Sequence, residues 1–107
     1  MTYDIPAIIE EVVAGSAQLL DVREIEEWQA GHLAAAKHYP LSEMDLGEDP
    51  TPCVDFNKKT YIHCRSGNRV RKARRILEAI GFREVVMLPV SFVDFKASGA
   101  DVIEAGA

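Results

Sequence analysis

One short segment, Tyr61–Val70, carries most of the residues that could do chemistry: it reads Tyr-Ile-His-Cys-Arg-Ser-Gly-Asn-Arg-Val. Cys64 comes at the end of a β-rich run, and a helical pattern opens a few residues later. A cysteine thiolate is a nucleophile, and a loop whose backbone N–H groups curl inward before a helix N-terminus binds anions. Gly67 permits backbone angles that a larger residue resists. We therefore predict a nucleophilic Cys64 in an anion-binding loop.

Positive charge gathers around the same segment. Arg65 and Arg69 offer forked donors that suit an oxyanion. They belong to a stretch, residues 56–77, that holds eight of the chain's twelve Lys and Arg and no Asp or Glu. The rest of the chain is strongly acidic, which argues against nonspecific nucleic-acid binding. About half of these bases should lie on the outer face of the following helix, where they are either solvated or a docking surface for an acidic partner.

Alternating helical and strand patterns must position this segment. Helices are expected at 4–15, 24–30, 68–80 and 90–96, and strands at 18–22, 37–39, 60–63 and 84–88. Ile25 and Trp28 are expected to anchor the second helix, while 45–58 is read as loop and 97–107 as a tail. Strands that alternate with helices on short connections predict an α/β fold. Its centre should be a mostly parallel sheet of about five short strands, flanked by helices on both faces.

Length and composition bound the class of protein. A chain of 107 residues fits one domain, here 1–107, and 48% hydrophobic residues exclude a disordered chain. Two cysteines are too few for a disulfide scaffold. No apolar run approaches the length of a membrane span, and the first residues lack the features of a secretory signal. We expect a cytoplasmic monomer that binds neither membrane nor nucleic acid.

Two motifs resemble those of the rhodanese family of sulfurtransferases. Cys64–Arg69 (Cys-Arg-Ser-Gly-Asn-Arg) is similar to the family's six-residue active-site loop. Upstream, 19–24 (Leu-Leu-Asp-Val-Arg-Glu), followed by Glu27-Trp28 and Gly31-His32-Leu33, is similar to its D-V-R-E then G-H-I pattern. The motifs come in the family's order, and the resemblance extends from about residue 18 to 93.

The resemblance implies a rhodanese-like fold and a sulfur transfer in two steps. Cys64 would take the outer sulfur of thiosulfate or a similar small anionic donor. A thiophilic acceptor, either cyanide or a thiol that could belong to a protein, would then remove it. No metal and no organic cofactor is implied. The implied donor-binding residues are Arg65, Ser66, Gly67, Asn68 and Arg69, and the implied structural supports are Asp21, Arg23 and His32.

Three places depart from the family's pattern. Ala34-Ala35-Ala36 stands where Pro-Gly-Ala is usual, and Val70 where Ser or Thr is usual. Pro89-Val90-Ser91 stands where the family tends to have Gly-Gly. The last two lie near the expected pocket, so they bear on substrate preference and rate more than on the fold.

Two other functions stay open. His63-Cys64 followed by Gly67 also resembles the H-C-x-x-G-x-x-R pattern of Cys-dependent phosphatases, and an arsenate-reductase-like enzyme belongs to the same alternative. That pattern needs arginine at position 70, where this chain has Val70, and no Trp-Pro-Asp stretch supplies a general acid. A noncatalytic rhodanese-like binding module is the third hypothesis, although such modules often lack the loop cysteine.

The remaining reactive side chains have plainer interpretations. Asp21 and Arg23 follow a strand at the same sheet edge, where they could form a buried pair. His63 should point away from Cys64, because side chains alternate along a strand, so a general-base role is disfavoured. His38 has no evident partner, and three scattered histidines do not make a metal site. Cys53 is either an idle thiol or a resolving thiol for a Cys64 persulfide.

Overall fold

The computed structural model describes residues 4–45, 47, 55–63 and 67–104. The predictions for Cys53, Cys64, Arg65 and Ser66 therefore lie outside the described residues. Gly67 and Asn68 are described only as the first two residues of a helix.

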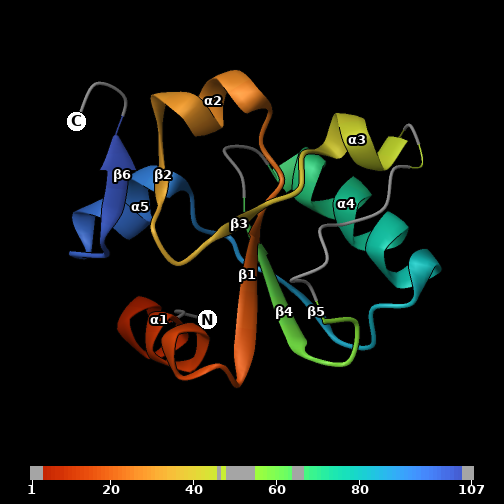
Figure 1. Ribbon diagram of the computed structural model, residues 1–107, viewed down its shortest axis with the longest axis horizontal. Helices are drawn as coiled ribbons and strands as arrows, with labels where there is room; N and C mark the ends of the chain where they lie inside the picture. Colours follow the sequence, from red (N-terminus) through yellow and green to blue (C-terminus); the bar gives the residue numbers. More distant parts are fainter. Residues whose placement is uncertain (1–3, 46, 48–54, 64–66, 105–107) are drawn as a thin grey trace.

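The chain alternates between helices and strands (Figure 1). In order, the elements are α1 (Ile5–Ala14), β1 (Ala17–Asp21), α2 (Ile25–Ala30), β2 (Gly31–Leu33), β3 (Lys37–His38), α3 (Leu41–Asp45), β4 (Lys59–His63), α4 (Gly67–Ile80), β5 (Val85–Met87), α5 (Phe92–Ala97) and β6 (Val102–Glu104).

The central sheet has the strand order β3-β1-β4-β5, and every pair in it is parallel. The prediction of an α/β fold with a parallel sheet is confirmed. The expected count of about five strands is replaced by four in the described central sheet. In the register of β1 and β4, Asp21 lies beside His63, so both strands end at the same sheet edge.

Successive residues of β1 face opposite sides of the sheet, and each side has its own apolar core. Leu20 packs with Ile62 and with Val70, Ala73 and Leu77 of α4. Leu19 packs on the other side, with residues of α1 and α5. Figure 1 shows α1 and α5 on one side of the sheet and α3 and α4 on the other. The expectation of helices on both faces is confirmed.

Local signals explain the ends of α1. The Asp4 carboxylate accepts a hydrogen bond from the Ala7 N–H at 3.2 Å, and Pro6 stands in the first turn, where its missing N–H costs nothing. Gly15 ends the helix in the left-handed region at φ 88°, which glycine adopts without strain. Val13, near the end of α1, is 75% exposed although it is apolar.

Two further sequence predictions were wrong. Ile25 does not anchor α2, since it is exposed, and Trp28 alone makes that helix's ring contacts. The segment read as a tail contains β6, which pairs antiparallel with β2 through Gly31↔Glu104 and Leu33↔Val102. Each of these strands is only three residues long, too short to show a two-residue period, so the pairing follows from tertiary contacts.

Candidate active site

The segment with the predicted nucleophile joins the carboxyl end of β4 to the N-terminus of α4. β4 ends at His63 and α4 begins at Gly67, with Cys64–Ser66 between them. β4 is an inner strand, flanked by β1 and β5. In open parallel sheets, ligands bind at this edge, and the N-terminus of a long helix favours negative charge there. α4 has 14 residues, and the positive end of its dipole is at its N-terminus, Gly67, which directly follows this segment.

A buried ion pair lies at the same edge, just after β1. The Arg23 Nε lies 2.9 Å from Asp21 Oδ1, and the Arg23 Nη2 lies 2.8 Å from Asp21 Oδ2. Arg23 Nη2 also donates to the Gly31 carbonyl at 2.7 Å, and the guanidinium lies 4.8 Å from the centre of the Phe92 ring. The expected buried pair is therefore present, and it links β1 to β2 and α5. Its bracing of the Cys64 segment stays a prediction.

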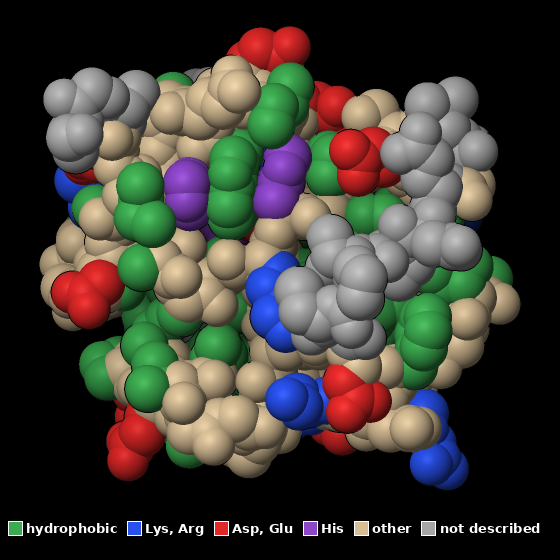
Figure 2. All heavy atoms as spheres, in the orientation of Figure 1, with side chains coloured by type: hydrophobic (Ala, Val, Ile, Leu, Met, Phe, Trp, Pro, Cys, Tyr) green, Lys and Arg blue, Asp and Glu red, His purple; other side chains and the backbone are tan. Residues whose placement is uncertain are grey.

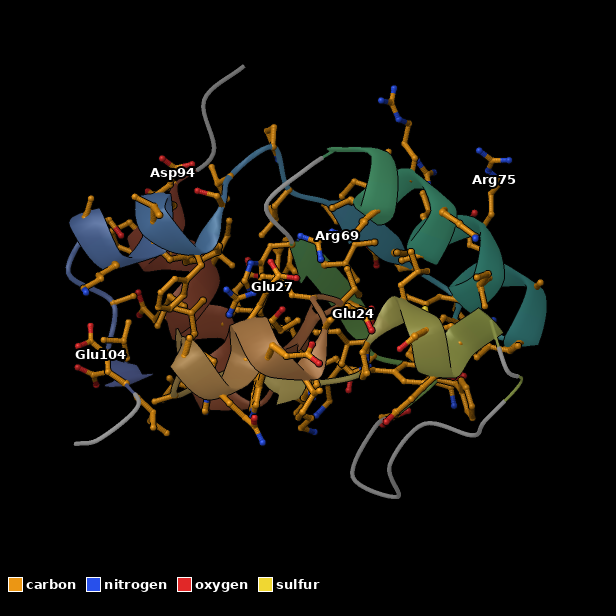
Figure 3. All side chains as sticks on the ribbon, turned by 90° about the horizontal axis from the view of Figure 1, so that it is seen from above. Glu24, Glu27, Arg69, Arg75, Asp94 and Glu104 are labelled. Carbon is orange, nitrogen blue, oxygen red and sulfur yellow. The ribbon has the colours of Figure 1, made fainter. Side chains whose placement is uncertain are left out.

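A second ion pair ties α2 to the first turn of α4. The Arg69 guanidinium donates to both carboxylate oxygens of Glu27, with Nη2 at 3.1 Å from Oε2. Figure 3 shows the two side chains pointing toward one another between these helices. The hydrogen bond from Arg69 lowers the pKa of Glu27 below its usual value. The sequence interpretation assigned Arg69 to an anion and overlooked Glu27, although Glu27 belongs to the upstream motif.

His63 is the last residue of β4, lies beside Asp21 in the sheet, and is fully buried. Its Nε2 is 3.9 Å from Asp21 Oδ2, and its ring centre is 5.2 Å from that of Phe95. Among the described residues, neither ring nitrogen has a hydrogen-bond partner. Burial lowers the pKa of His63 to about 4, although the nearby Asp21 carboxylate opposes the shift. The imidazole is therefore neutral and weakly basic at neutral pH.

The low pKa of His63 predicts an acid-dependent loss of stability. Its ordinary pKa of 6.5 applies in the unfolded chain, so between pH 6.5 and 4 the unfolded state binds a proton that the native state refuses. Above pH 6.5, His63 is neutral in both states and does not reduce the free energy of unfolding. This free energy should fall by about 2 kcal/mol by pH 5 and by about 3 kcal/mol by pH 4. Urea unfolding across this range measures the effect. His63→Leu should flatten the profile by that amount, and equal slopes in the two proteins would contradict the assignment.

The other two histidines sandwich Trp28. The Trp28 ring centre lies 3.5 Å from that of His32 and 4.6 Å from that of His38, and both pairs are stacked. His32 Nδ1 lies 2.8 Å from the Trp28 carbonyl, as expected for a hydrogen-bonded residue near a helix end. His38 has a partner that the sequence did not reveal, since its Nε2 lies 2.8 Å from the Arg23 carbonyl. Figure 2 shows two histidine side chains on either side of a hydrophobic one on this face.

Two of the departures from the family's pattern have structural consequences. Val70 is buried in the core with Ala73 and Leu77, so an apolar residue suits this position in α4. Ser91 is the N-cap of α5: its hydroxyl accepts from the Asp94 N–H at 3.3 Å, and its own N–H donates to Asp94 at 2.8 Å. Ser91 therefore starts a helix that lies beside the site.

Within the described ranges, no three metal-ligating side chains come together as a metal ion would need. Of the helices that the structure describes, none is both long enough and apolar enough to span a membrane.

The fold and the site together define a class: a parallel α/β domain in which a cysteine-bearing segment leads from an inner strand into a basic helix. The family model described as Rhodanese-like domain matches residues 7–98. The chain therefore belongs to the rhodanese-like domain family.

Curated relatives share this region of the chain. The Bacillus subtilis protein YrkF is 37% identical over 71 residues, which cover 66% of this chain and 37% of YrkF. The uncharacterized protein YqhL of the same organism is 33% identical over 85 residues, covering 78% of this chain and 65% of YqhL. The chain thus spans between about a third and two thirds of the length of these relatives.

Solved structures share the fold at low sequence identity. The Alr3790 protein of Anabaena superposes with a TM-score of 0.78 at 19% identity, over 98% of this chain and 94% of that one. The human single-domain sulfurtransferase TSTD1 superposes with a TM-score of 0.73 at 20% identity, over 92% of this chain and 97% of that one. At these identities, the likeness shows the rhodanese-like fold.

Proposed function

We propose that this protein is a sulfurtransferase that moves the outer sulfur of thiosulfate, or of a similar small anion, to a thiophilic acceptor through a persulfide on Cys64. It works without a metal or an organic cofactor, as a monomer in the cytoplasm. The observation that supports the proposal most is the connection between an inner parallel strand and a long helix. β4 ends one residue before Cys64, and α4 begins three residues after it.

The proposed chemistry is two displacements at sulfur. The Cys64 thiolate attacks the outer sulfur of thiosulfate, a Cys64 S–S bond forms, and the donor's S–S bond breaks with sulfite as the leaving group. The helix N-terminus and the N–H groups from Arg65 to Arg69 stabilise the resulting persulfide anion. In the second step, the acceptor attacks the terminal sulfur, and the Cys64 thiolate leaves. Because the enzyme carries sulfur between the two steps, ping-pong kinetics are expected.

A paired assay tests this function. The protein is incubated with thiosulfate and cyanide, and the release of sulfite and thiocyanate is measured; a parallel sample receives p-nitrophenyl phosphate. We expect equal amounts of sulfite and thiocyanate, and no hydrolysis of the phosphate ester. Phosphate hydrolysis without sulfur transfer would favour the phosphatase alternative. A folded protein that is inactive in both assays would favour the binding module. Either result would overturn the proposal.

Arg69→Ala is expected to raise the KM for thiosulfate about tenfold or more, with a much smaller effect on kcat. Hydrogen bonds to charged groups contribute about 1.5–3 kcal/mol, and about 1.4 kcal/mol is a factor of ten. The variant also leaves Glu27 without its cation, which adds repulsion against an anionic donor. Steady-state kinetics at varied thiosulfate concentration measure the change.

The double variant Glu27→Gln/Arg69→Ala separates these two effects. It removes the unpaired carboxylate, so part of the lost affinity for thiosulfate should return. If Arg69→Ala instead lowers kcat and leaves the KM unchanged, Arg69 positions the Cys64 segment and does not hold the donor.

A further inference from the structure

A pocket of about 420 Å³ lies between the end of α2 and the start of α5. We call it the α2–α5 pocket. The side chains that matter for its chemistry are Arg23, Glu27, Ala30, Phe92 and Val93, and Gly31 contributes backbone.

The α2–α5 pocket borders the elements that flank Cys64. Glu27 lines it and is ion-paired to Arg69, the third residue of α4. Arg23 lines it two residues after the end of β1, whose last residue lies beside His63. In Figure 3, Glu27 lies between α5 and the start of α4. The pocket therefore opens at the same sheet edge as the Cys64 segment.

Both charged residues of the pocket already have partners of opposite charge. Arg23 is paired with Asp21 and also donates to the Gly31 carbonyl, and Glu27 is paired with Arg69. Neither presents an uncompensated charge to a ligand. A small free anion gains little from such a site, because its desolvation is not repaid by a net positive charge.

The remaining walls are mostly apolar, and the one further polar side chain among the described lining residues, Ser91, has its hydroxyl bonded to Asp94. Phe92 and Val93 come from α5, and Ala30 from α2. Val93 is 68% exposed, so most of this apolar side chain faces solvent at the rim of the pocket. A Cβ at Gly31 would come within 3.3 Å of the Phe92 ring, so glycine lets this ring pack closely against the backbone of β2.

The volume of the α2–α5 pocket indicates the size of ligand that it could hold. Pockets that hold small organic ligands have volumes of about 300–1,000 Å³, and this pocket falls in that range. Thiosulfate and cyanide, with five and two heavy atoms, would leave most of it empty.

We propose that the α2–α5 pocket holds the uncharged, apolar body of a small organic thiol that accepts sulfur from Cys64. The inference rests on the proposed function and names its acceptor class. In the transfer step, the proton of the acceptor thiol passes to the terminal sulfur of the Cys64 persulfide anion, and the resulting acceptor thiolate attacks that sulfur. A new S–S bond forms on the acceptor, the proton stays on the transferred sulfur, and the Cys64 thiolate leaves, so no oxidant or reductant is consumed.

A series of neutral thiols tests the proposal on the unmodified protein. With thiosulfate as donor, the acceptors are mercaptoethanol, mercaptopropanol and mercaptohexanol, and cyanide is run in parallel. The kcat/KM for the thiol should rise about fourfold for each methylene that enters the pocket. An absence of turnover with cyanide would overturn the proposed function, and the acceptor class with it. Turnover with cyanide but equal kcat/KM for all three thiols would overturn the acceptor class alone.

Two exposed valines provide a matched pair of variants. Val93→Asp places a carboxylate on the pocket rim, and the ratio of kcat/KM for mercaptohexanol to that for cyanide should fall about tenfold. Val13→Asp makes the same change on α1, where Val13 is 75% exposed, and should leave this ratio as in the unmodified protein. An unchanged ratio in Val93→Asp, or an equal fall in both variants, would contradict the assignment of the pocket.

Discussion

Cys64→Ser should reduce sulfur transfer from thiosulfate to cyanide to the background of the assay, a loss of at least about 10⁴-fold, since removal of a catalytic nucleophile can cost about 10⁶-fold in kcat. A serine hydroxyl at neutral pH is not ionised, and it cannot form a persulfide. The measurement is the initial rate of thiocyanate formation, with circular dichroism to show that the variant is folded.

Cys53→Ser is the matched control, because the chain has only two cysteines. If Cys53 is idle, this variant keeps the rate of the unmodified protein. If Cys53 is a resolving thiol, treatment with thiosulfate should yield a disulfide in the unmodified protein and none in Cys53→Ser. Full activity in Cys64→Ser would mean that the covalent mechanism is wrong.

Asp21→Ala should lower the free energy of unfolding by about 3–5 kcal/mol, the cost of leaving one partner of a buried ion pair without its counter-charge. The Arg23 side chain is only 7% exposed and that of Asp21 is fully buried, so water cannot replace the lost carboxylate. Urea or thermal unfolding near pH 7 measures the loss.

Two further variants separate the buried charge from the general effect of truncation. Asp21→Ala/Arg23→Met removes both charges and should recover much of the stability. Glu78→Ala breaks an exposed pair with Arg74 on α4 and should cost no more than about 0.5 kcal/mol. If Asp21→Ala cost as little as Glu78→Ala, the pair at the sheet edge would not be the structural support that we describe.

The parallel sheet could be predicted because its signals are local. Leu19 and Leu20 are successive apolar residues that face opposite cores, which is typical of a strand covered on both sides. The antiparallel pair β2–β6 could not, because it joins two three-residue segments about seventy residues apart. The exposure of Ile25 also depends on tertiary contacts, so its apolar side chain alone did not show whether it would be buried.

In the candidate site, too, some features could be predicted from the sequence and others could not. Asp21 and Arg23 were expected to pair because both lie at the carboxyl end of one strand, and two hydrogen bonds join the Arg23 guanidinium to the Asp21 carboxylate. The pair of Glu27 and Arg69 joins residues 42 positions apart, and a chain with 17 acids offers many partners for one arginine. The buried setting of His63 depends on Phe95 and Asp21 packing around it, so its low pKa could be derived only from the fold.

The most direct test of the central claim is the mass of the intact protein after brief exposure to thiosulfate and removal of the donor. We predict a gain of one sulfur atom, located on the peptide that contains Cys64, absent from Cys64→Ser and removed by cyanide with formation of thiocyanate. An unchanged mass in a folded protein, or a sulfur adduct that persists in Cys64→Ser, would contradict it.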